Sequence, residues 1–280
     1  MIRKKQQNRR DTRDRYINYQ VEQFKGLIEF IEQVTRRRMD WDKLAEYVDI
    51  SLETWRVWDE AEKLRKAIPC PMGTEDNFNV FVPGVMREGT QAALDFYKEL
   101  HAELQYRVEN KIGVIPDEKY RLIWGGGLPP WHTMNIFNYF EKLGAVFVRE
   151  VGTPMGGDPV PDSVTDPLAR LAYRDYMAYR ERHRHDLTGL GYNFLTFGNP
   201  VDLIEAYHAD GVVLHQLKSC RSTTVGQLYC TQLVKKYCGV PTLILESDIC
   251  DVRDYFEADW KAKIDAFLET VAIHKQGKQR

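Results

Sequence analysis

The clearest candidate for chemistry in this sequence is Cys220, which follows an apolar run and precedes a helical one. The basic residues Lys218 and Arg221 lie on either side of it. A helix N-terminus and neighbouring positive charge both lower the pKa of a thiol and favour the thiolate, which ligates metals and attacks electrophiles. We therefore predict that Cys220 is a metal ligand or a nucleophile.

The other four cysteines are weaker candidates. Cys230 and Cys238 fall in the helical run after Cys220, and Cys70 lies between two prolines, so we expect these three to be core or surface thiols. Cys250 follows another apolar run and could approach Cys220. No Cys-x-x-Cys pair occurs, which argues against a closed zinc site, and an iron–sulfur cluster usually needs more thiolates than these.

A triple glycine, Gly125, Gly126 and Gly127, ends the first apolar run of the second half of the chain. It has neither the Walker A pattern nor the dinucleotide-binding spacing. Glycines here either let the backbone approach a ligand or make a tight turn, and we predict a cofactor-binding loop. His132 follows, as a catalytic candidate that could hydrogen-bond a carbonyl or as a residue that only begins a helix.

Polar residues also occur in or after two later apolar runs. His215 lies within one, and Glu246 and Asp248 come at the end of another. A carboxylate at a strand end can act as a base or orient a partner, but it can equally cap a helix or form an ion pair. Of these, Asp248 is the predicted catalytic residue. The sequence has no Gly-x-Ser-x-Gly elbow and no His-Glu-x-x-His helix.

The second half of the chain alternates short apolar runs with helical patterns. Such alternation is typical of βαβ units and a parallel sheet. We therefore predict an α/β fold, a helical segment followed by a doubly wound, four-stranded parallel sheet of the Rossmann or flavodoxin type, whose strand ends bring these candidates to one edge. The expected strands are 120–124, 145–151, 211–219 and 241–246, and the expected helices are 131–143, one beginning at 166, 201–208, 224–237 and 258–273.

The first part of the chain reads as helical. Apolar residues recur at intervals of three and four from Tyr16 onward, with a helix start expected at Ser51 and a further helix at 89–108. The first dozen residues are polar and basic, as in a solvated or interface-lying arm. We therefore divide the chain into a helical segment with a basic arm, 1–115, and an α/β domain, 116–280.

Composition excludes several classes of protein. The chain has 280 residues, with 39 Lys and Arg against 41 Asp and Glu, so it lacks the basic excess of a dedicated nucleic-acid binder. The mean hydropathy is −0.48, and no apolar run is long enough to cross a bilayer. The basic start is followed by polar residues rather than a secretory signal, and the five scattered cysteines do not form a secreted disulfide framework. We expect a reduced, cytoplasmic protein.

The residues around Cys220 resemble a known family. The stretches DGVVLHQLKSCRSTTVGQ and GVPTLILESDICDVRDY are similar to the C-terminal domain of the 2-hydroxyacyl-CoA dehydratase and benzoyl-CoA reductase family. EKYRLIWGGGLPPWHTMNIFNYFEKLGAVFV looks like the first strand, loop, helix and strand of that domain, and WDKLAEYV looks like its preceding helical segment. The resemblance covers nearly the whole chain.

The resemblance implies a [4Fe-4S] cluster with Cys220 as one ligand. The family's other cysteine ligands lie in an N-terminal α/β domain that has no counterpart here. The remaining ligands are therefore expected outside this chain, either because it is a C-terminal fragment or because another polypeptide supplies them. The implied partners are a homologous second subunit in a heterodimer, an ATP-dependent iron–sulfur activator and an acyl-CoA substrate.

The resemblance also implies a radical, anaerobic mechanism. The activator passes one electron through the cluster to the thioester carbonyl of a 2-hydroxyacyl-CoA, and the resulting ketyl radical anion expels the α-hydroxyl. The enoxy radical loses a β-proton and returns the electron, which yields a 2-enoyl-CoA. Asp248 and Asp251 are candidates for a catalytic role by their position alone. The alternatives are a benzoyl-CoA type reductase subunit, a cluster-less structural subunit, or an unrelated flavodoxin-like binding module.

Overall fold

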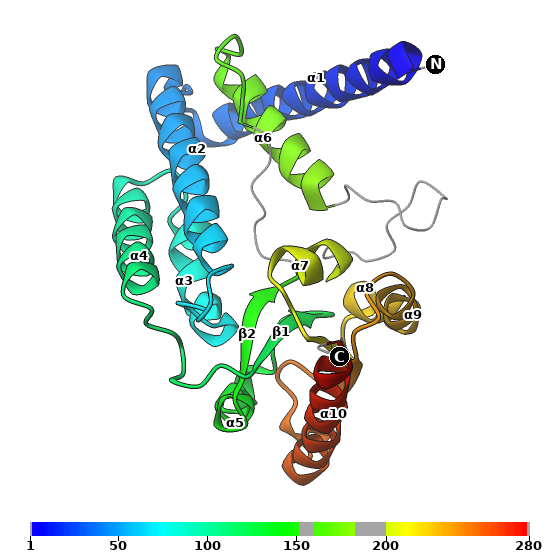
Figure 1. Cartoon of the computed structure of the whole chain (residues 1–280). Helices are drawn as coiled ribbons and strands as arrows, with labels where there is room; N and C mark the ends of the chain where they lie inside the picture. Colours follow the sequence, from blue (N-terminus) through cyan, green and yellow to red (C-terminus); the bar gives the residue numbers. More distant parts are fainter. Residues whose placement is uncertain (1, 152–158, 183–199, 279–280) are drawn as a thin grey trace. The chain divides into compact units, whose positions relative to one another are not determined.

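The computed structural model describes residues 2–151, 159–182 and 200–278 (Figure 1). The chain divides into two compact units, and each is described by itself. The first consists of Met1–Asp59, Pro83–Lys98 and Pro154–Glu181, and the second of Glu60–Val82, Glu99–Thr153 and Arg182–Arg280. The division into 1–115 and 116–280 predicted from the sequence uses consecutive segments, whereas these units combine separate ones. That division stays a prediction.

Helices make up the first part of the chain, as the periodicity predicts. They are α1 (Ile2–Thr35), α2 (Trp41–Leu64), α3 (Thr74–Met86), α4 (Gln91–Glu109) and, later in the chain, α6 (Pro167–Arg182). The residues expected as a basic arm lie within α1. Helix α3 was not predicted; it contains Pro83, a residue type that usually marks a helix boundary.

Two helix boundaries in the first unit test the capping signals. Asp166 caps α6 as predicted, because its side chain accepts a hydrogen bond of 2.7 Å from the Ala169 N–H. The helix start expected at Ser51 is wrong, since α2 runs through it without a break. The Ser51 hydroxyl is buried and donates to the Glu88 carboxylate at 2.6 Å, so tertiary contact uses the group that would otherwise cap.

The second unit contains a four-stranded parallel sheet, which confirms the predicted fold class. Its strand order is β2-β1-β3-β4. The strands are β1 (Tyr120–Gly125), β2 (Ala145–Glu150), β3 (Gly211–Leu217) and β4 (Thr242–Ser247), and the helices are α5 (Ile136–Lys142), α7 (Pro200–Ala206), α8 (Arg221–Thr224), α9 (Gln227–Tyr237) and α10 (Glu257–Lys278), with short 3₁₀ turns η1 (Trp131–Thr133) and η2 (Val252–Asp254).

Helices cover both faces of this sheet. Leu122 and Trp124 of β1 belong to a core cluster that includes side chains of α5 and α10. Arg121 alternates with them along the strand and faces the opposite side, where its Nε donates to the Tyr207 carbonyl, just after α7, at 2.8 Å. The doubly wound arrangement is therefore confirmed.

Two predicted helices are interrupted. The helix expected at 131–143 is the turn η1 followed by α5, and the helix expected at 224–237 is split into α8 and α9. The second break lies at Gly226, whose φ of +90° is a left-handed conformation that ends a helix. Glycine provides this conformation without a Cβ penalty, so the break was readable from the sequence.

A buried ion network lies at the end of β2. It consists of Glu62, Arg65, Arg149 and Glu150, each at most 2% exposed. Arg65 bridges the two carboxylates, at 2.7 Å from Glu62 and 2.9 Å from Glu150, and Arg149 contacts both as well. Burial alone would raise the pKa of the Glu150 carboxyl, but the charges of Arg65 and Arg149 outweigh it and lower that pKa to about 2. The two arginines therefore keep Glu150 ionised at neutral pH.

Candidate functional site

The predicted site residues gather at the carboxyl edge of the sheet, in the loops that follow β1, β3 and β4. The loop after β1 contacts the loop after β4, because the Trp131 N–H donates to the Ile249 carbonyl at 3.1 Å. The loop after β3 contacts the end of β4, since the Lys218 N–H donates to the Ser247 carbonyl at 3.2 Å, and it contacts the following loop through Ser219 and Asp248. The topology thus places the glycine loop, His132, Cys220 and Asp248 on one side of the second unit, as the parallel sheet predicts.

The glycine loop is closely packed against protein. A Cβ on Gly126 would lie 2.6 Å from the His215 carbonyl oxygen and 2.4 Å from the Gln227 side-chain nitrogen. Gly126 also has a φ of +83°, in the left-handed region. The Trp124 indole N–H fastens the loop by donating to the Gly127 carbonyl at 2.8 Å. Packing alone thus accounts for the need for glycine, and cofactor binding by this loop stays a prediction.

The Asp248 side chain holds the loop after β4 by hydrogen bonds to its backbone. One carboxylate oxygen accepts hydrogen bonds from the N–H groups of Cys250, at 2.9 Å, and Asp251, at 3.1 Å. A hydrogen bond from Ser219, together with these two, lowers the pKa of Asp248 to about 2. A carboxylate with so low a pKa is a weak base at neutral pH but a good hydrogen-bond acceptor and negative charge. Its catalytic role stays a prediction.

Cys220 lies between the end of β3 and the start of α8, at the carboxyl edge of the sheet. It occupies the N-cap position of α8, with an extended backbone, and is partly exposed. Its neighbour Ser219 contacts Asp248, and Cys250 is exposed in the loop that Asp248 organises. The two thiols therefore belong to adjoining loops, as the sequence order of the strands predicts.

The remaining three cysteines differ from Cys220 and Cys250 in their burial or their contacts. Burial raises the pKa of the Cys70 thiol to about 11 and that of Cys230 to about 12. Both side chains are buried and therefore poor ligands or nucleophiles. Cys238 is partly exposed at the end of α9, with its thiol 3.9 Å from the Val201 carbonyl. These placements agree with the prediction of core or surface thiols.

His132 is the middle residue of the short turn η1. Its ring packs edge-on against Tyr255, with centroids 5.7 Å apart. Within the described residues, both ring nitrogens are buried and have no hydrogen-bond partner. Since both nitrogens are covered by protein atoms, a donor or acceptor would reach them only if neighbouring groups moved.

His215 and Glu246 have clear structural contacts. Glu246 is exposed and pairs with Lys218 at 3.3 Å. Of the roles left open by the sequence, this contact agrees with an ion pair. His215 is buried, with Nδ1 at 2.7 Å from the Leu128 carbonyl and Nε2 at 2.8 Å from the Ser247 hydroxyl. Burial lowers the pKa of His215 to about 4, so its ring is neutral at pH 7.

Sequence reasoning missed two residues that hold this edge together. Ser247 bonds His215, and Gln227 donates to the carbonyls of His215, at 2.8 Å, and Thr223, at 2.9 Å. The only signal for Gln227 was its place directly after Gly226, where a helix begins. Neither residue type points to such contacts without the fold.

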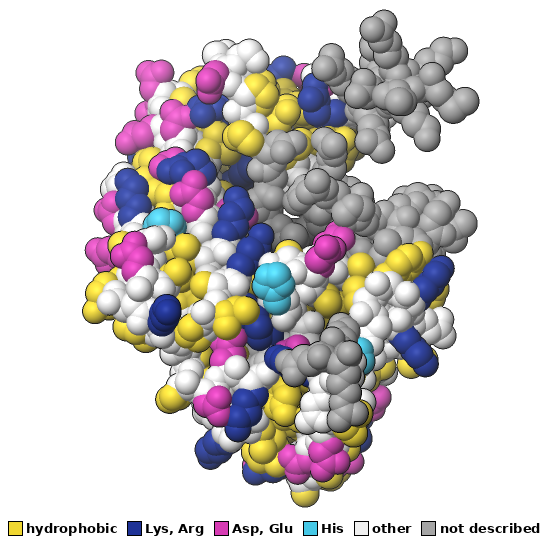
Figure 2. Space-filling view, in the orientation of Figure 1, with side chains coloured by type: hydrophobic (Ala, Val, Ile, Leu, Met, Phe, Trp, Pro, Cys, Tyr) yellow, Lys and Arg dark blue, Asp and Glu magenta, His cyan; other side chains and the backbone are white. Residues whose placement is uncertain are grey.

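Exposed apolar side chains occur in the segments that follow β1, β3 and β4. Figure 2 shows hydrophobic side chains at the surface over α8 and α9. Monomers seldom keep such groups together in water, so they favour a contact surface. We call them the apolar collar: Leu128, Trp131, Val225, Leu228, Tyr229, Val252 and Phe256, which are 39% to 72% exposed.

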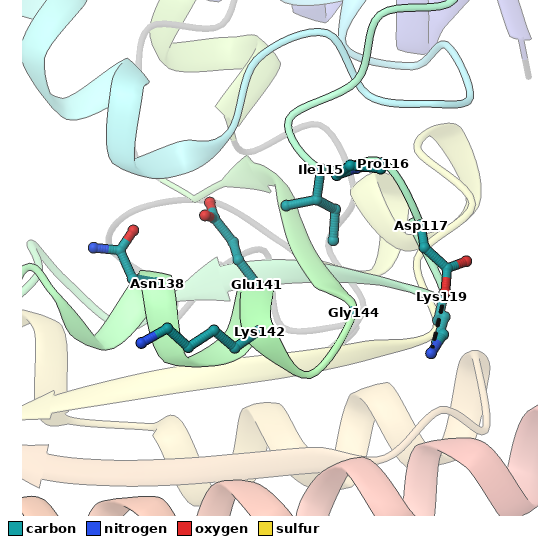
Figure 3. Close-up of a pocket in the computed structure, with 8 residues that line it drawn as sticks. All are labelled: Ile115, Pro116, Asp117, Lys119, Asn138, Glu141, Lys142 and Gly144. Carbon is teal, nitrogen blue, oxygen red and sulfur yellow. Dashed lines mark ion pairs between the residues drawn. The ribbon is translucent and has the colours of Figure 1, made fainter.

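A surface pocket lies at the opposite end of the sheet. It has a volume of about 570 Å³ and includes Lys119 and Gly144, which precede β1 and β2 (Figure 3). Lys119 pairs with Asp117 at 3.1 Å. Burial, together with the charges of Glu75 and Asp76, raises the pKa of Glu141 to about 7. None of the predicted site residues lines this pocket.

The described residues do not complete a metal site. No three or more His, Cys, Asp or Glu side chains within them come close enough together to hold a metal ion. Cys220 and Cys250 are the cysteines in the loops at this edge, and metal binding by Cys220 stays a prediction. None of the described helices is long and apolar enough to cross a membrane.

Comparison with known proteins confirms the resemblance inferred from the sequence. A family model described as "2-hydroxyglutaryl-CoA dehydratase, D-component" matches residues 6–271. The chain is 31% identical to a benzoyl-CoA reductase subunit of Thauera aromatica, and the match covers 93% of this chain and 61% of the relative. It is 23% identical to the (R)-phenyllactyl-CoA dehydratase alpha subunit of Clostridium sporogenes. It is 25% identical to the (R)-2-hydroxyisocaproyl-CoA dehydratase alpha subunit of Clostridioides difficile. Both matches again cover 93% of this chain and 61% of the relative. The chain thus spans about six tenths of the length of these relatives.

Proposed function

Because the chain belongs to the 2-hydroxyglutaryl-CoA dehydratase D-component family, we propose that it acts as a subunit of a 2-hydroxyacyl-CoA dehydratase. The observation that carries the proposal is the family match over residues 6–271 together with the placement of Cys220 at the carboxyl edge of the sheet. The reaction is the loss of water from a 2-hydroxyacyl-CoA to give a 2-enoyl-CoA. The proposed enzyme is a lyase that this chain does not complete alone.

Cys220 is the proposed thiolate ligand of a [4Fe-4S] cluster, with its other ligands outside this chain. When bound, such a cluster supplies one-electron reduction of the substrate thioester. In this chain, Cys220 is partly exposed at the N-cap position of α8, next to Arg221. Gly125, Gly126 and Gly127 hold the neighbouring loop close to β3, so the edge keeps a fixed shape beside the thiol.

The polar residues at the edge have separate proposed roles. Asp248 holds the Cys250 loop and adds negative charge, which fits an orienting role better than proton abstraction. His132 has two unpaired ring nitrogens among the described residues and is the better candidate to hydrogen-bond the thioester carbonyl or to move a proton.

A homologous second subunit is the proposed partner at the apolar collar. All three of these relatives are named as subunits, two of them as alpha subunits, and such names imply further subunits. The collar supports this proposal, because large apolar side chains from the segments after β1, β3 and β4 are exposed at the sheet edge that Cys220 also follows. An ATP-dependent iron–sulfur activator is the proposed electron donor.

A second candidate is a subunit of an aromatic acyl-CoA reductase. The 31% identity to a benzoyl-CoA reductase subunit exceeds the 23% and 25% found for two of the dehydratase subunits. A third candidate is a cluster-less structural subunit, and it is supported by the finding that no three His, Cys, Asp or Glu side chains of the described residues lie close enough to hold a metal ion.

Anaerobic reconstitution tests the cluster. The full chain, alone and co-expressed with its partner subunit, is incubated with iron and sulfide, and both elements and the electron paramagnetic resonance spectrum are measured. We expect a cluster in the complex that Cys220→Ser abolishes and the matched control Cys238→Ser retains. A complex without a Cys220-dependent cluster would leave the structural-subunit alternative.

Turnover separates the two enzyme candidates. With the partner subunit, activator and ATP present, the dehydratase converts a 2-hydroxyacyl-CoA to the 2-enoyl-CoA with no net consumption of electrons. The reductase instead consumes two electrons for each benzoyl-CoA. Activity on benzoyl-CoA, with none on a 2-hydroxyacyl-CoA, would reject the dehydratase proposal.

A further inference from the structure

One side chain on the central part of the sheet touches two of the loops that form the candidate site. His215 lies on β3, buried to 0% exposure, between the loops that follow β1 and β4. Its Nδ1 lies 2.7 Å from the Leu128 carbonyl, directly after the glycine loop. Its Nε2 lies 2.8 Å from the Ser247 hydroxyl, directly before Asp248.

Hydrogen-bond chemistry decides the tautomer of this ring. A carbonyl oxygen only accepts, so Nδ1 must carry the proton that it shares with Leu128. In a neutral imidazole the other nitrogen is then an acceptor. The Ser247 hydroxyl has one proton and two acceptors in reach, Nε2 at 2.8 Å and the Asp248 carbonyl at 3.2 Å, and we assign the proton to the shorter contact with Nε2. Each nitrogen is therefore committed to one loop, and neither has a proton to exchange with a substrate.

The surroundings keep the ring neutral and in place. The rings of Trp124 and Trp260 lie 5.7 Å and 5.9 Å from the imidazole, so two large apolar groups pack against it. The charged or titratable groups that act on it are His132, which disfavours its protonation, and Asp248, which favours it. Burial dominates over both.

The backbone of the same residue reaches the third loop. Its carbonyl accepts a hydrogen bond of 2.8 Å from the Gln227 side chain. That amide also donates to the Thr223 carbonyl, at 2.9 Å, in the helix that Cys220 caps. Gln227 thus links β3 to the segment that carries the proposed ligand. We call His215, Leu128, Ser247 and Gln227 the edge network.

We infer that His215 is a positioning residue, whose neutral imidazole sets the glycine loop and the Ser247–Asp251 loop relative to each other on either side of β3. It acts through Leu128 and Ser247, because both of its ring nitrogens are committed to these two residues. This role goes beyond the proposed function, because it concerns the shape of the edge whatever binds there. The tests therefore use the full chain without metal or substrate.

Hydrogen–deuterium exchange measured by mass spectrometry tests the role in His215→Phe. The variant keeps a ring of similar size but loses both hydrogen bonds. We expect exchange to become at least tenfold faster in peptides covering 126–132 and 247–251, with little change in β2. The matched control is Val213→Ala, two residues earlier in β3 and buried on the same face. A similar, uniform increase in both variants would overturn the inference, since it would mark only a loss of global stability.

Rescue by a conservative variant separates the two links. In His215→Asn the side-chain amide can replace Nδ1–H toward Leu128 but cannot reach Ser247. We expect slow exchange to return at 126–132 and not at 247–251. Equal protection of both loops, or of neither, contradicts the assignment of one nitrogen to each loop.

A second measurement applies even if both His215 variants fail to fold. Ser247→Ala leaves the ring intact and removes only the hydroxyl, and we expect severalfold faster exchange at 247–251. In the wild-type chain, ¹⁵N chemical shifts should report a protonated Nδ1 and a bare Nε2 from pH 5 to pH 8. A ring protonated at Nε2, or exchange at 247–251 unchanged by Ser247→Ala, overturns the proposal.

Discussion

Two polar networks lie at strand ends of the same sheet, and they treat charge in opposite ways. The buried ion network at the end of β2 keeps four charged side chains almost fully away from water. The edge network centres on a neutral histidine, and the nearby carboxylates of Asp248 and Asp251 remain at the surface. The first joins its side chains by ion pairs, and the second by hydrogen bonds between neutral groups.

The difference separates structure from candidate function. A desolvated charge must be paired inside the protein, and the charges of the buried ion network pair with one another. At the edge, backbone N–H groups and a neutral ring shape the loops, and the thiols of Cys220 and Cys250 stay accessible. Four predictions test this contrast, from the largest expected effect to the smallest.

Breaking the buried ion network should have the largest effect. Arg65→Leu leaves the carboxylates of Glu62 and Glu150 buried without their bridging cation. We expect the free energy of unfolding, measured by urea denaturation, to fall by about 3–5 kcal/mol. The control Arg56→Leu removes an exposed pair with Glu53 and should cost less than about 1 kcal/mol. Equal losses would mean that burial does not distinguish the two pairs.

Acid should weaken the edge network before it weakens the buried one. The pKa of His215 is lowered from 6.5 to about 4 in the folded chain, so between these values the unfolded chain binds more protons. Above pH 6.5, the neutral His215 ring contributes about 3 kcal/mol to the free energy of unfolding. This contribution is lost as the pH falls to about 4. Glu150, with a pKa of about 2, loses its contribution only at lower pH, from its unfolded value toward 2.

Denaturation at several pH values checks this order. The free energy of unfolding should decline between pH 6.5 and pH 4 in the wild-type chain, and His215→Gln should flatten that part of the profile. An unchanged slope in the variant would assign the acid sensitivity to another group.

Crowding the glycine loop should have the next largest effect. Gly126→Ala places a Cβ against Gln227 and the His215 backbone at a left-handed φ. We expect a loss of at least about 2 kcal/mol in unfolding free energy, from strain and overpacking together. Gly239→Ala is the matched control, because Gly239 also has a positive φ but has open space around it, and should lose only about 1–2 kcal/mol. Equal costs would show that the loop is not tightly packed.

The smallest effect should come from an exposed ion pair at the same edge. Lys218 contacts Glu246 and Asp254 while its side chain is 43% exposed. Water and salt screen such pairs, so Lys218→Met should change the free energy of unfolding by less than about 1 kcal/mol. A loss comparable to that of Arg65→Leu would remove the distinction between the two regions.

The comparison of sequence and structure shows where periodic patterns suffice. The four strands were predicted to within about two residues, because buried parallel strands are short, apolar and bounded by glycine or proline. The order of the strands along the chain then placed Cys220, Asp248 and the glycine loop at one edge. Errors occurred where local signals compete with tertiary contacts, as at Ser51, whose hydroxyl bonds Glu88 instead of capping a helix.

By itself, the sequence determined the family, the α/β class and the strand ends at which the site candidates lie, since these depend on residue type and spacing along the chain. Only the tertiary structure decided which polar groups meet. Arg65 and Glu150 are 85 residues apart, and His215 and Ser247 are 32 apart, yet each pair shares a hydrogen bond. Such partners carry no local signature, because a buried polar group needs a partner in space rather than in sequence.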